Sequence, residues 1–68
     1  MKNNIKYLRT KLNMTQADVL IKTGIPITTI SGLETGRRNI KDITLETAIK
    51  LADCFGCDVK DLVDRDKE

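Results

Sequence analysis

The chain has 68 residues, a formal net charge of +2 and two aromatic side chains, Tyr7 and Phe55. A chain of this length allows one small domain with a core of aliphatic side chains, so tight helix packing or a partner must help to stabilise it. No apolar run approaches the roughly 20 residues of a membrane-spanning helix, and the N-terminus has no apolar segment typical of a signal peptide. The composition therefore argues against a membrane protein and makes the cytoplasm the default location.

The charge is divided unevenly between the two halves of the chain. Residues 1–41 contain eight bases and two acids, a net +6, whereas residues 42–68 contain four bases and eight acids, a net −4. Such a division suggests that the basic half meets a polyanion. Two differently solvated faces would give the same pattern, so the charge alone leaves both interpretations open.

Helical periodicity runs along the chain, and capping residues mark where the helices begin and end. Thr15, followed by Asp18 at the third helical position, resembles a capping box, and Gly24 suits the left-handed residue after a helix. Pro26 fits the first turn of the next helix. No strand pattern competes. The expected helices cover about residues 3–12, 16–23, 27–34, 45–55 and 59–64, with a longer connection at 36–43.

The spacing of apolar residues predicts which side of each helix faces the core. The expected inward side chains are Ile5, Leu8 and Leu12 of the first helix, Val19 of the second, Ile30 and Leu33 of the third, Leu45, Ala48, Ile49, Ala52 and Phe55 of the fourth, Val59, Leu62 and Val63 of the last, and Ile40 and Ile43 of the connection. These elements predict an all-α fold, a compact bundle of five short helices. We expect a single domain over residues 1–68, with a core at about 3–63 and a charged tail at 64–68.

Two cysteines, Cys54 and Cys57, form the sequence CFGC. Structural zinc takes four ligands, and the chain has no His and no third Cys. A redox pair would belong to a βαβ context, which is absent from the pattern. We therefore interpret both as small buried side chains and expect no metal, no cofactor and, since no set of catalytic roles is assembled, no enzyme.

The second and third helices, joined by a tight turn with Gly24, form a helix-turn-helix pattern. The segment from Met14 to Glu34, MTQADVLIKTGIPITTISGLE, resembles the helix-turn-helix of the phage Cro and repressor type, the XRE family. GRRN matches the basic loop of that family, and ITLETAIKLADCFGCDVKDLV matches its last two helices. The resemblance covers about residues 3–63 and implies a lambda-repressor-like DNA-binding domain.

The resemblance also implies roles for individual residues. Arg9 and Glu34 match an ion pair between the first and third helices, and each follows a core-facing Leu, so each would want a partner. The positions facing bases are Ile27, Thr28, Thr29, Ser31 and Gly32. The positions facing phosphates are Thr15, Gln16, Arg37, Arg38, Asn39 and Lys41. Phosphate contacts would dominate affinity without reading sequence.

The function implied is that of a sequence-specific DNA-binding transcriptional regulator, with repression the favoured direction. It would act as a homodimer on a palindromic operator, with the third helix in the major groove and no small-molecule substrate. The candidates for the dimer interface are Phe55, Val59, Leu62 and Val63.

The sequence departs from the family at three positions of the helix-turn-helix. Leu20 replaces a small residue, Thr23 an apolar one, and Gly32 removes a side chain that commonly reads bases. None of the base-facing residues is an Arg, Asn or Gln, which make bidentate base contacts. With Ile21 also expected at the surface, these departures support an alternative: a protein-interaction module, antitoxin-like or accessory, that binds DNA weakly.

Overall fold

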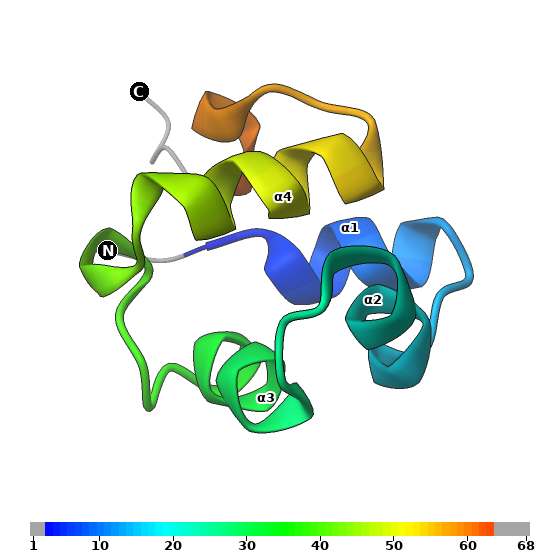
Figure 1. Cartoon of the computed structure of the whole chain (residues 1–68), viewed down its shortest axis with the longest axis horizontal. Helices are drawn as coiled ribbons and strands as arrows, with labels where there is room; N and C mark the ends of the chain where they lie inside the picture. The colour runs from blue at the N-terminus through cyan, green and yellow to red at the C-terminus, as the bar shows by residue number, and fades with distance from the viewer. Residues whose placement is uncertain (1–2, 64–68) are drawn as a thin grey trace.

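Short helices pack against one another in the computed structural model (Figure 1), and their buried side chains form one core, aliphatic except for Phe55. The structure describes residues 3–63. In chain order its elements are α1 (Ile5–Lys11), α2 (Gln16–Thr23), α3 (Ile27–Thr35), the 3-10 helix η1 (Ile40–Asp42), α4 (Leu45–Phe55) and the 3-10 helix η2 (Val59–Leu62).

The fold is all-helical, but residues 3–63 contain four α-helices and not five. The expected fifth helix is the short 3-10 helix η2. It begins with a capping box between Asp58 and Asp61 and ends because Val63 is extended, with φ −104° and ψ 146°, and forms an antiparallel bridge with Asn3. The charged tail expected at 64–68 lies outside the described residues.

The caps of α2 form as the sequence predicts. Thr15 Oγ1 accepts a hydrogen bond from the backbone N–H of Asp18 at 3.0 Å, and the Asp18 carboxylate accepts one from the Thr15 N–H at 2.8 Å. Gly24 ends the helix with φ +76°, in the region that glycine adopts without strain. These local interactions fix both ends of α2.

The core collects side chains from every α-helix. Its fully buried members are Ile5, Val19, Ile30, Leu33, Leu51 and Leu62. Leu12, expected to point inward, is 46% exposed because α1 ends one residue before it. Ile40 is buried under the connection after α3 and Ile43 is half-buried, as expected.

The buried face of α4 differs from the predicted stripe. Ala48, Ala52 and Phe55 are buried as expected, but Leu45 is 70% exposed and Ile49 is 44% exposed. The helix packs mainly against α2 and η2, and this contact turns toward the core the face that carries Leu51, which the stripe omitted. Two large aliphatic side chains are therefore left on the surface.

Cys54 lies in the last turn of α4 and Cys57 follows the helix, and both are free thiols half-buried against the core. Burial raises the pKa of both thiols above the ordinary value, and for Cys57 the negative charges of Asp61 and Asp58 raise it further. Both are therefore protonated at neutral pH. No group of three potential metal ligands occurs among the described residues, and none of their helices is long and apolar enough to cross a membrane.

Candidate nucleic-acid interface

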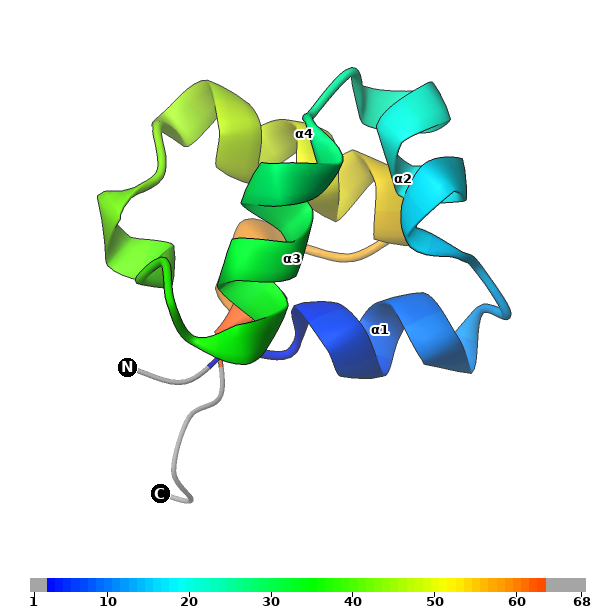
Figure 2. The ribbon, with the colours of Figure 1, turned by 90° about the horizontal axis from the view of Figure 1, so that it is seen from below.

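The helix α3 lies across one face of the molecule, with α2 beside it and the loop 36–43 on its other side (Figure 2). On the opposite side, α4 lies behind α3 in this view. The face seen in Figure 2 therefore brings together the two helices of the helix-turn-helix and the basic loop that follows them.

The turn between α2 and α3 is held by the side chain of Thr23, which is buried. Its hydroxyl donates to the Val19 carbonyl at 2.6 Å and accepts from the Ile25 N–H at 3.1 Å. A polar side chain therefore fits at this normally apolar position because it satisfies a buried backbone N–H. Below the turn, the fully buried Ile30 and Leu33 fix α3 on the core.

The C-terminal half of α3 is tied to α1 by an ion pair. Arg9 Nε lies 2.6 Å from Glu34 Oε2, and Arg9 Nη2 donates to Glu34 Oε1 at 3.0 Å, which is a bidentate geometry. The two side chains are 13% and 5% exposed. Arg9 Nη1 also donates to the Met14 carbonyl at 2.8 Å, so one guanidinium joins α1, α3 and the connection that precedes α2.

Glu34 keeps its charge despite its position. Burial raises the pKa of this carboxyl, but the hydrogen bonds from Arg9 and Gln16 and the positive charge of Arg9 outweigh burial, so its pKa lies below the ordinary value. The same contact raises the pKa of Arg9. Both groups therefore stay ionised at neutral pH.

The residues expected to face bases differ in their exposure. Ile27 is 38% exposed and Thr28 is exposed, whereas Thr29 and Ser31 are half-buried. Gly32 is buried, because the side chain of Arg38 covers it: a Cβ on Gly32 would lie 3.3 Å from the Arg38 Cβ. Gly32 therefore presents no side chain and little free surface to a base, and its expected base contact stays a prediction.

Two phosphate candidates, Thr15 and Gln16, lie at the N-terminus of α2. The Thr15 hydroxyl, which caps the helix, keeps its own proton free to donate. Gln16 is half-buried, and its Nε2 donates to Glu34 Oε1 at 3.1 Å. The amide thus extends the ion-pair network, and this contact was missed because nothing local in the sequence pairs two residues 18 positions apart.

The other phosphate candidates lie in the loop after α3. Arg37, Arg38 and Lys41 are exposed, and Asn39 is half-buried. The Asn39 Oδ1 accepts from the Lys41 N–H at 3.1 Å, which caps η1. The loop therefore presents its cations from a fixed backbone beside α3.

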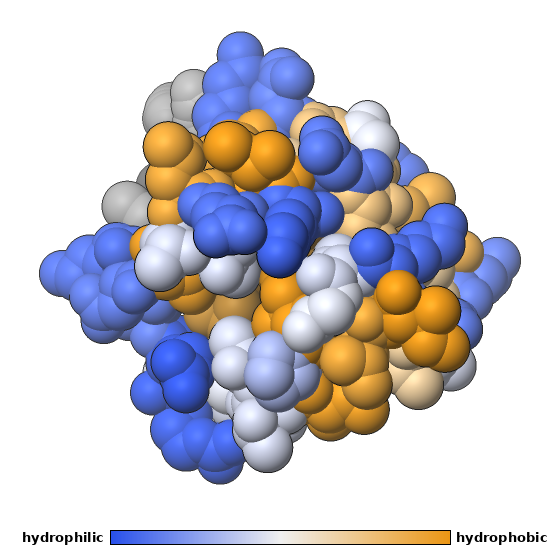
Figure 3. Space-filling model, viewed as in Figure 1, coloured by the Kyte–Doolittle hydropathy of each residue, from blue (hydrophilic) through white to orange (hydrophobic). Residues whose placement is uncertain are grey.

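The expected dimer candidates divide into two groups. Phe55 is 7% exposed and Leu62 is 1% exposed, so both stabilise the core of one chain and have little surface left for a partner. Val59 is 40% exposed and Val63 half-buried, and both line an apolar groove of about 280 Å³ together with the exposed Leu45. Figure 3 shows apolar side chains at the surface among hydrophilic ones.

Comparison with known proteins gives two kinds of match. Residues 5–62 match the family model described as helix-turn-helix. The chain is 39% identical over 62 residues to an uncharacterized HTH-type transcriptional regulator of Methanocaldococcus jannaschii, covering 91% of this chain and 89% of that protein. It is 35% identical over 68 residues to an uncharacterized HTH-type transcriptional regulator of Archaeoglobus fulgidus, covering 100% of this chain and 92% of that protein.

Proposed function

The chain belongs to the XRE-type helix-turn-helix family, and from this premise we propose that it is a non-catalytic, sequence-specific transcriptional regulator that binds double-stranded DNA in the cytoplasm. Its single domain, lambda-repressor-like in arrangement, places α3 in the major groove. One observation carries the proposal: the exposed, uncharged face of α3 is bordered by a loop with three exposed cations.

Different side chains on this face contact the phosphates and the bases of the DNA. Arg37 and Lys41 reach phosphates, and Thr15 adds a hydroxyl at the start of α2. Thr28 and Ser31 offer hydroxyls to base edges, and Ile27 packs against a thymine methyl. Since such base contacts discriminate weakly, the shape and deformability of the DNA contribute to selectivity.

The test is a selection from a randomised duplex library at fixed salt, followed by titration of the enriched duplex at several salt concentrations. We expect Arg37→Ala and Lys41→Ala each to reduce the slope of log K against log salt by about 1, because each removes one phosphate contact. Lys60→Ala is the control, since Lys60 is exposed on η2. The proposal is contradicted if the slope is unchanged in a variant that carries both Arg37→Ala and Lys41→Ala, or if the selection enriches no sequence.

We further propose that two copies pair through the surface around the N-terminus of α4. Leu45 and Ile49 lie one turn apart and are both exposed, and Leu45 borders the groove that Val59 and Val63 line. A two-fold pair would match a palindromic operator, and the bound pair would repress by excluding other proteins from the DNA.

Sedimentation equilibrium tests the pairing. Leu45→Asp should shift the wild-type dimer toward monomer, because the carboxylate would be buried without a partner at the interface. Ile21→Asp, at an 80% exposed apolar residue of α2, is the matched control and should leave the mass unchanged. A monomeric wild type at micromolar concentration, with or without operator DNA, contradicts the pairing.

The exposure of Ile21 favours a second candidate function, that of a protein-interaction module with weak DNA binding. An isolated apolar side chain on α2 is also ordinary for a protein surface. The salt titration distinguishes the two functions, because a protein partner held by apolar contacts dissociates little as salt rises, whereas DNA held by phosphate contacts dissociates steeply.

A further inference from the structure

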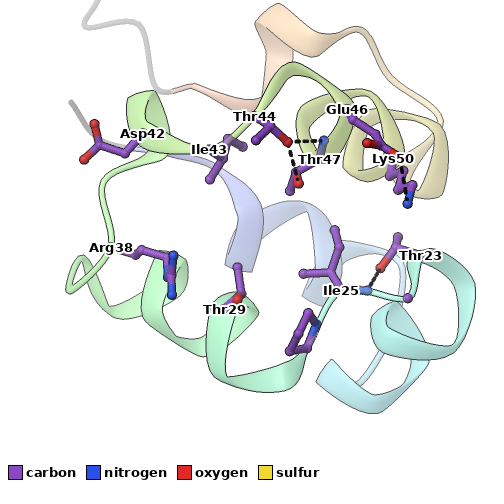
Figure 4. A pocket seen from close by; sticks show the side chains of 12 residues that line it. Thr23, Ile25, Thr29, Arg38, Asp42, Ile43, Thr44, Glu46, Thr47 and Lys50 are labelled. Carbon is purple, nitrogen blue, oxygen red and sulfur yellow. Dashed lines mark hydrogen bonds and ion pairs between the residues drawn. The ribbon is translucent and has the colours of Figure 1, made fainter.

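The side chain of Arg38 lies on α3 where residue 32 has no side chain. A Cβ on Gly32 would be 3.3 Å from the Arg38 Cβ, 3.9 Å from its Cδ and 3.8 Å from its Nε. The aliphatic stem of Arg38 therefore fills the space above Gly32. Figure 4 shows this side chain extending from the loop over α3, on the side of the helix that also carries Thr29.

The backbone holds Arg38 at the same place. Its N–H donates to the Gly32 carbonyl at 2.9 Å, and the chain can return to the helix because Gly36 adopts φ +84°. The residue is thus fixed twice against one turn of α3, by its backbone and by its stem. A side chain ordered before binding loses less entropy when it makes a directional contact.

The guanidinium itself stays available. Arg38 is exposed, and the ion pairs within residues 3–63 are Arg9–Glu34 and Glu46–Lys50. The face of α3 next to it carries only hydroxyl and aliphatic side chains. Arg38 therefore places beside α3 the bidentate donor that the helix does not supply from its own residues.

We propose that Arg38 reads sequence by donating two parallel hydrogen bonds to N7 and O6 of a guanine at the major-groove edge. Gly32 positions the Arg38 side chain, because the absence of a side chain at residue 32 leaves the space that the Arg38 stem fills. This inference rests on the proposed function, with α3 in the groove. It moves Arg38 from the phosphate-contacting set to the base-contacting set, and it gives Gly32 a positioning role in place of a contact.

Substitutions at residue 32 provide an independent test of whether Gly32 positions the Arg38 side chain. An Ala side chain at 32 requires the Arg38 stem to shift by a few tenths of an ångström. The longer Gln side chain would compete with the stem for the same space. Ala has a higher helix propensity than Gly, so neither loss of fold nor loss of helix is expected from Gly32→Ala. Altered base preference in a fully folded variant would therefore report the position of Arg38.

The experiment applies the randomised-duplex selection, at one salt concentration, to the wild type and to Arg38→Ala, Arg38→Lys, Gly32→Ala, Gly32→Gln and Arg37→Ala. We expect the wild type to enrich a guanine at one position of each half-site. Arg38→Ala should lose that preference alone and bind the enriched duplex about tenfold more weakly, the discrimination typical of one bidentate contact. Arg38→Lys should also lose it, because Lys keeps the charge without the planar fork.

The remaining variants separate the possible failures. Gly32→Ala and Gly32→Gln should both weaken the preference for guanine. Arg37→Ala should instead weaken binding to all duplexes equally and leave every preference intact. If Arg38→Ala instead behaves as Arg37→Ala is expected to, Arg38 contacts a phosphate and the inference is wrong while the proposed function stands. If the wild type enriches no sequence, both are wrong.

Discussion

At the scale of single residues, Thr23 illustrates how a polar side chain stabilises the turn of the helix-turn-helix. Its hydroxyl sits between the Val19 carbonyl and the Ile25 N–H, and both hydrogen bonds are buried. An apolar side chain at this position would add burial but would leave the Ile25 N–H without this acceptor. The balance favours the hydroxyl, since an unsatisfied buried donor costs more than one methyl group contributes.

This balance predicts the effect of Thr23→Val, which replaces the hydroxyl with a methyl of similar shape. We expect the free energy of unfolding to fall by about 1–3 kcal/mol, the cost of one unsatisfied buried donor. Urea unfolding followed by circular dichroism measures it. Thr23→Ser keeps the hydroxyl and should recover most of the loss; a Ser variant as unstable as the Val variant would mean that the methyl matters more than the hydroxyl.

The carboxylate of Glu34 predicts a pH dependence of stability. Its pKa is lower in the folded chain than the value of about 4.3 expected in the unfolded chain, so its stabilising contribution is present above that value and is lost as the pH falls through the folded pKa. Glu34→Gln leaves the charge of Arg9 unpaired and should cost about 3 kcal/mol at pH 7. The difference in the free energy of unfolding between wild type and Glu34→Gln should decrease steadily below about pH 4.

Denaturant unfolding between pH 3 and pH 7 measures this difference in the free energy of unfolding. Glu46→Gln is the matched control, because its carboxylate is 78% exposed and lies 3.4 Å from Lys50, in a pair of the kind that contributes little. A difference in stability between wild type and Glu34→Gln that stays constant with pH would show that the cost does not come from losing the charge of Glu34.

At the scale of elements, the helix caps could be predicted from the sequence, whereas the buried faces of the helices could be predicted only in part. Thr15, Asp18 and Gly24 act on groups within a few residues of themselves, so the ends of α2 are a local property. The buried face of α4 depends on the direction from which α2 and η2 approach, which no local pattern contains. Five apolar residues matched a helical stripe, yet packing exposed Leu45 and buried Leu51 instead.

The buried face that α4 has in the structure predicts which of its leucines contributes most to the free energy of unfolding. Leu51→Ala removes a fully buried side chain and should cost about 2–5 kcal/mol. Leu45→Ala, at a side chain that is 70% exposed, should change the stability of the monomer by less than about 0.5 kcal/mol. Thermal unfolding at concentrations where the chain is monomeric measures both effects. Equal losses of stability would mean that Leu45 is buried, as the apolar stripe first predicted.

The candidate interface was predictable to a similar extent. The cations of the loop follow from composition, and the pairing of Arg9 with Glu34 follows from the family resemblance. The hydrogen bond from Gln16 to Glu34 and the stem of Arg38 on Gly32 both join distant parts of the chain through side-chain directions. These contacts decide which polar groups remain for DNA, and they appear only once α1, α2 and α3 are placed together.

At the scale of the whole molecule, the first described residues close the fold by binding its last ones. Asn4 donates through its backbone N–H to the Leu62 carbonyl at 2.8 Å, and its Nδ2 donates to the Asp61 and Val63 carbonyls at 3.2 Å each. Asn3 Nδ2 donates to the Leu33 carbonyl at 2.9 Å. The start of α1 thus satisfies carbonyls of both η2 and α3, and so joins three elements that are far apart in the sequence.

These hydrogen bonds predict that Asn4→Ala weakens η2 and the start of α1 together. The two carbonyls lose their side-chain donor, so we expect a loss of about 1–2 kcal/mol in the free energy of unfolding. Because these two segments form one cooperative unit, amide hydrogen exchange should accelerate in η2 and in the first turn of α1 alike. Asn39→Ala is the control, since Asn39 Oδ1 caps only the neighbouring Lys41 N–H, and its effect should stay within η1. Faster exchange in α1 alone would mean that η2 is held by Leu62 in the core and not by Asn4.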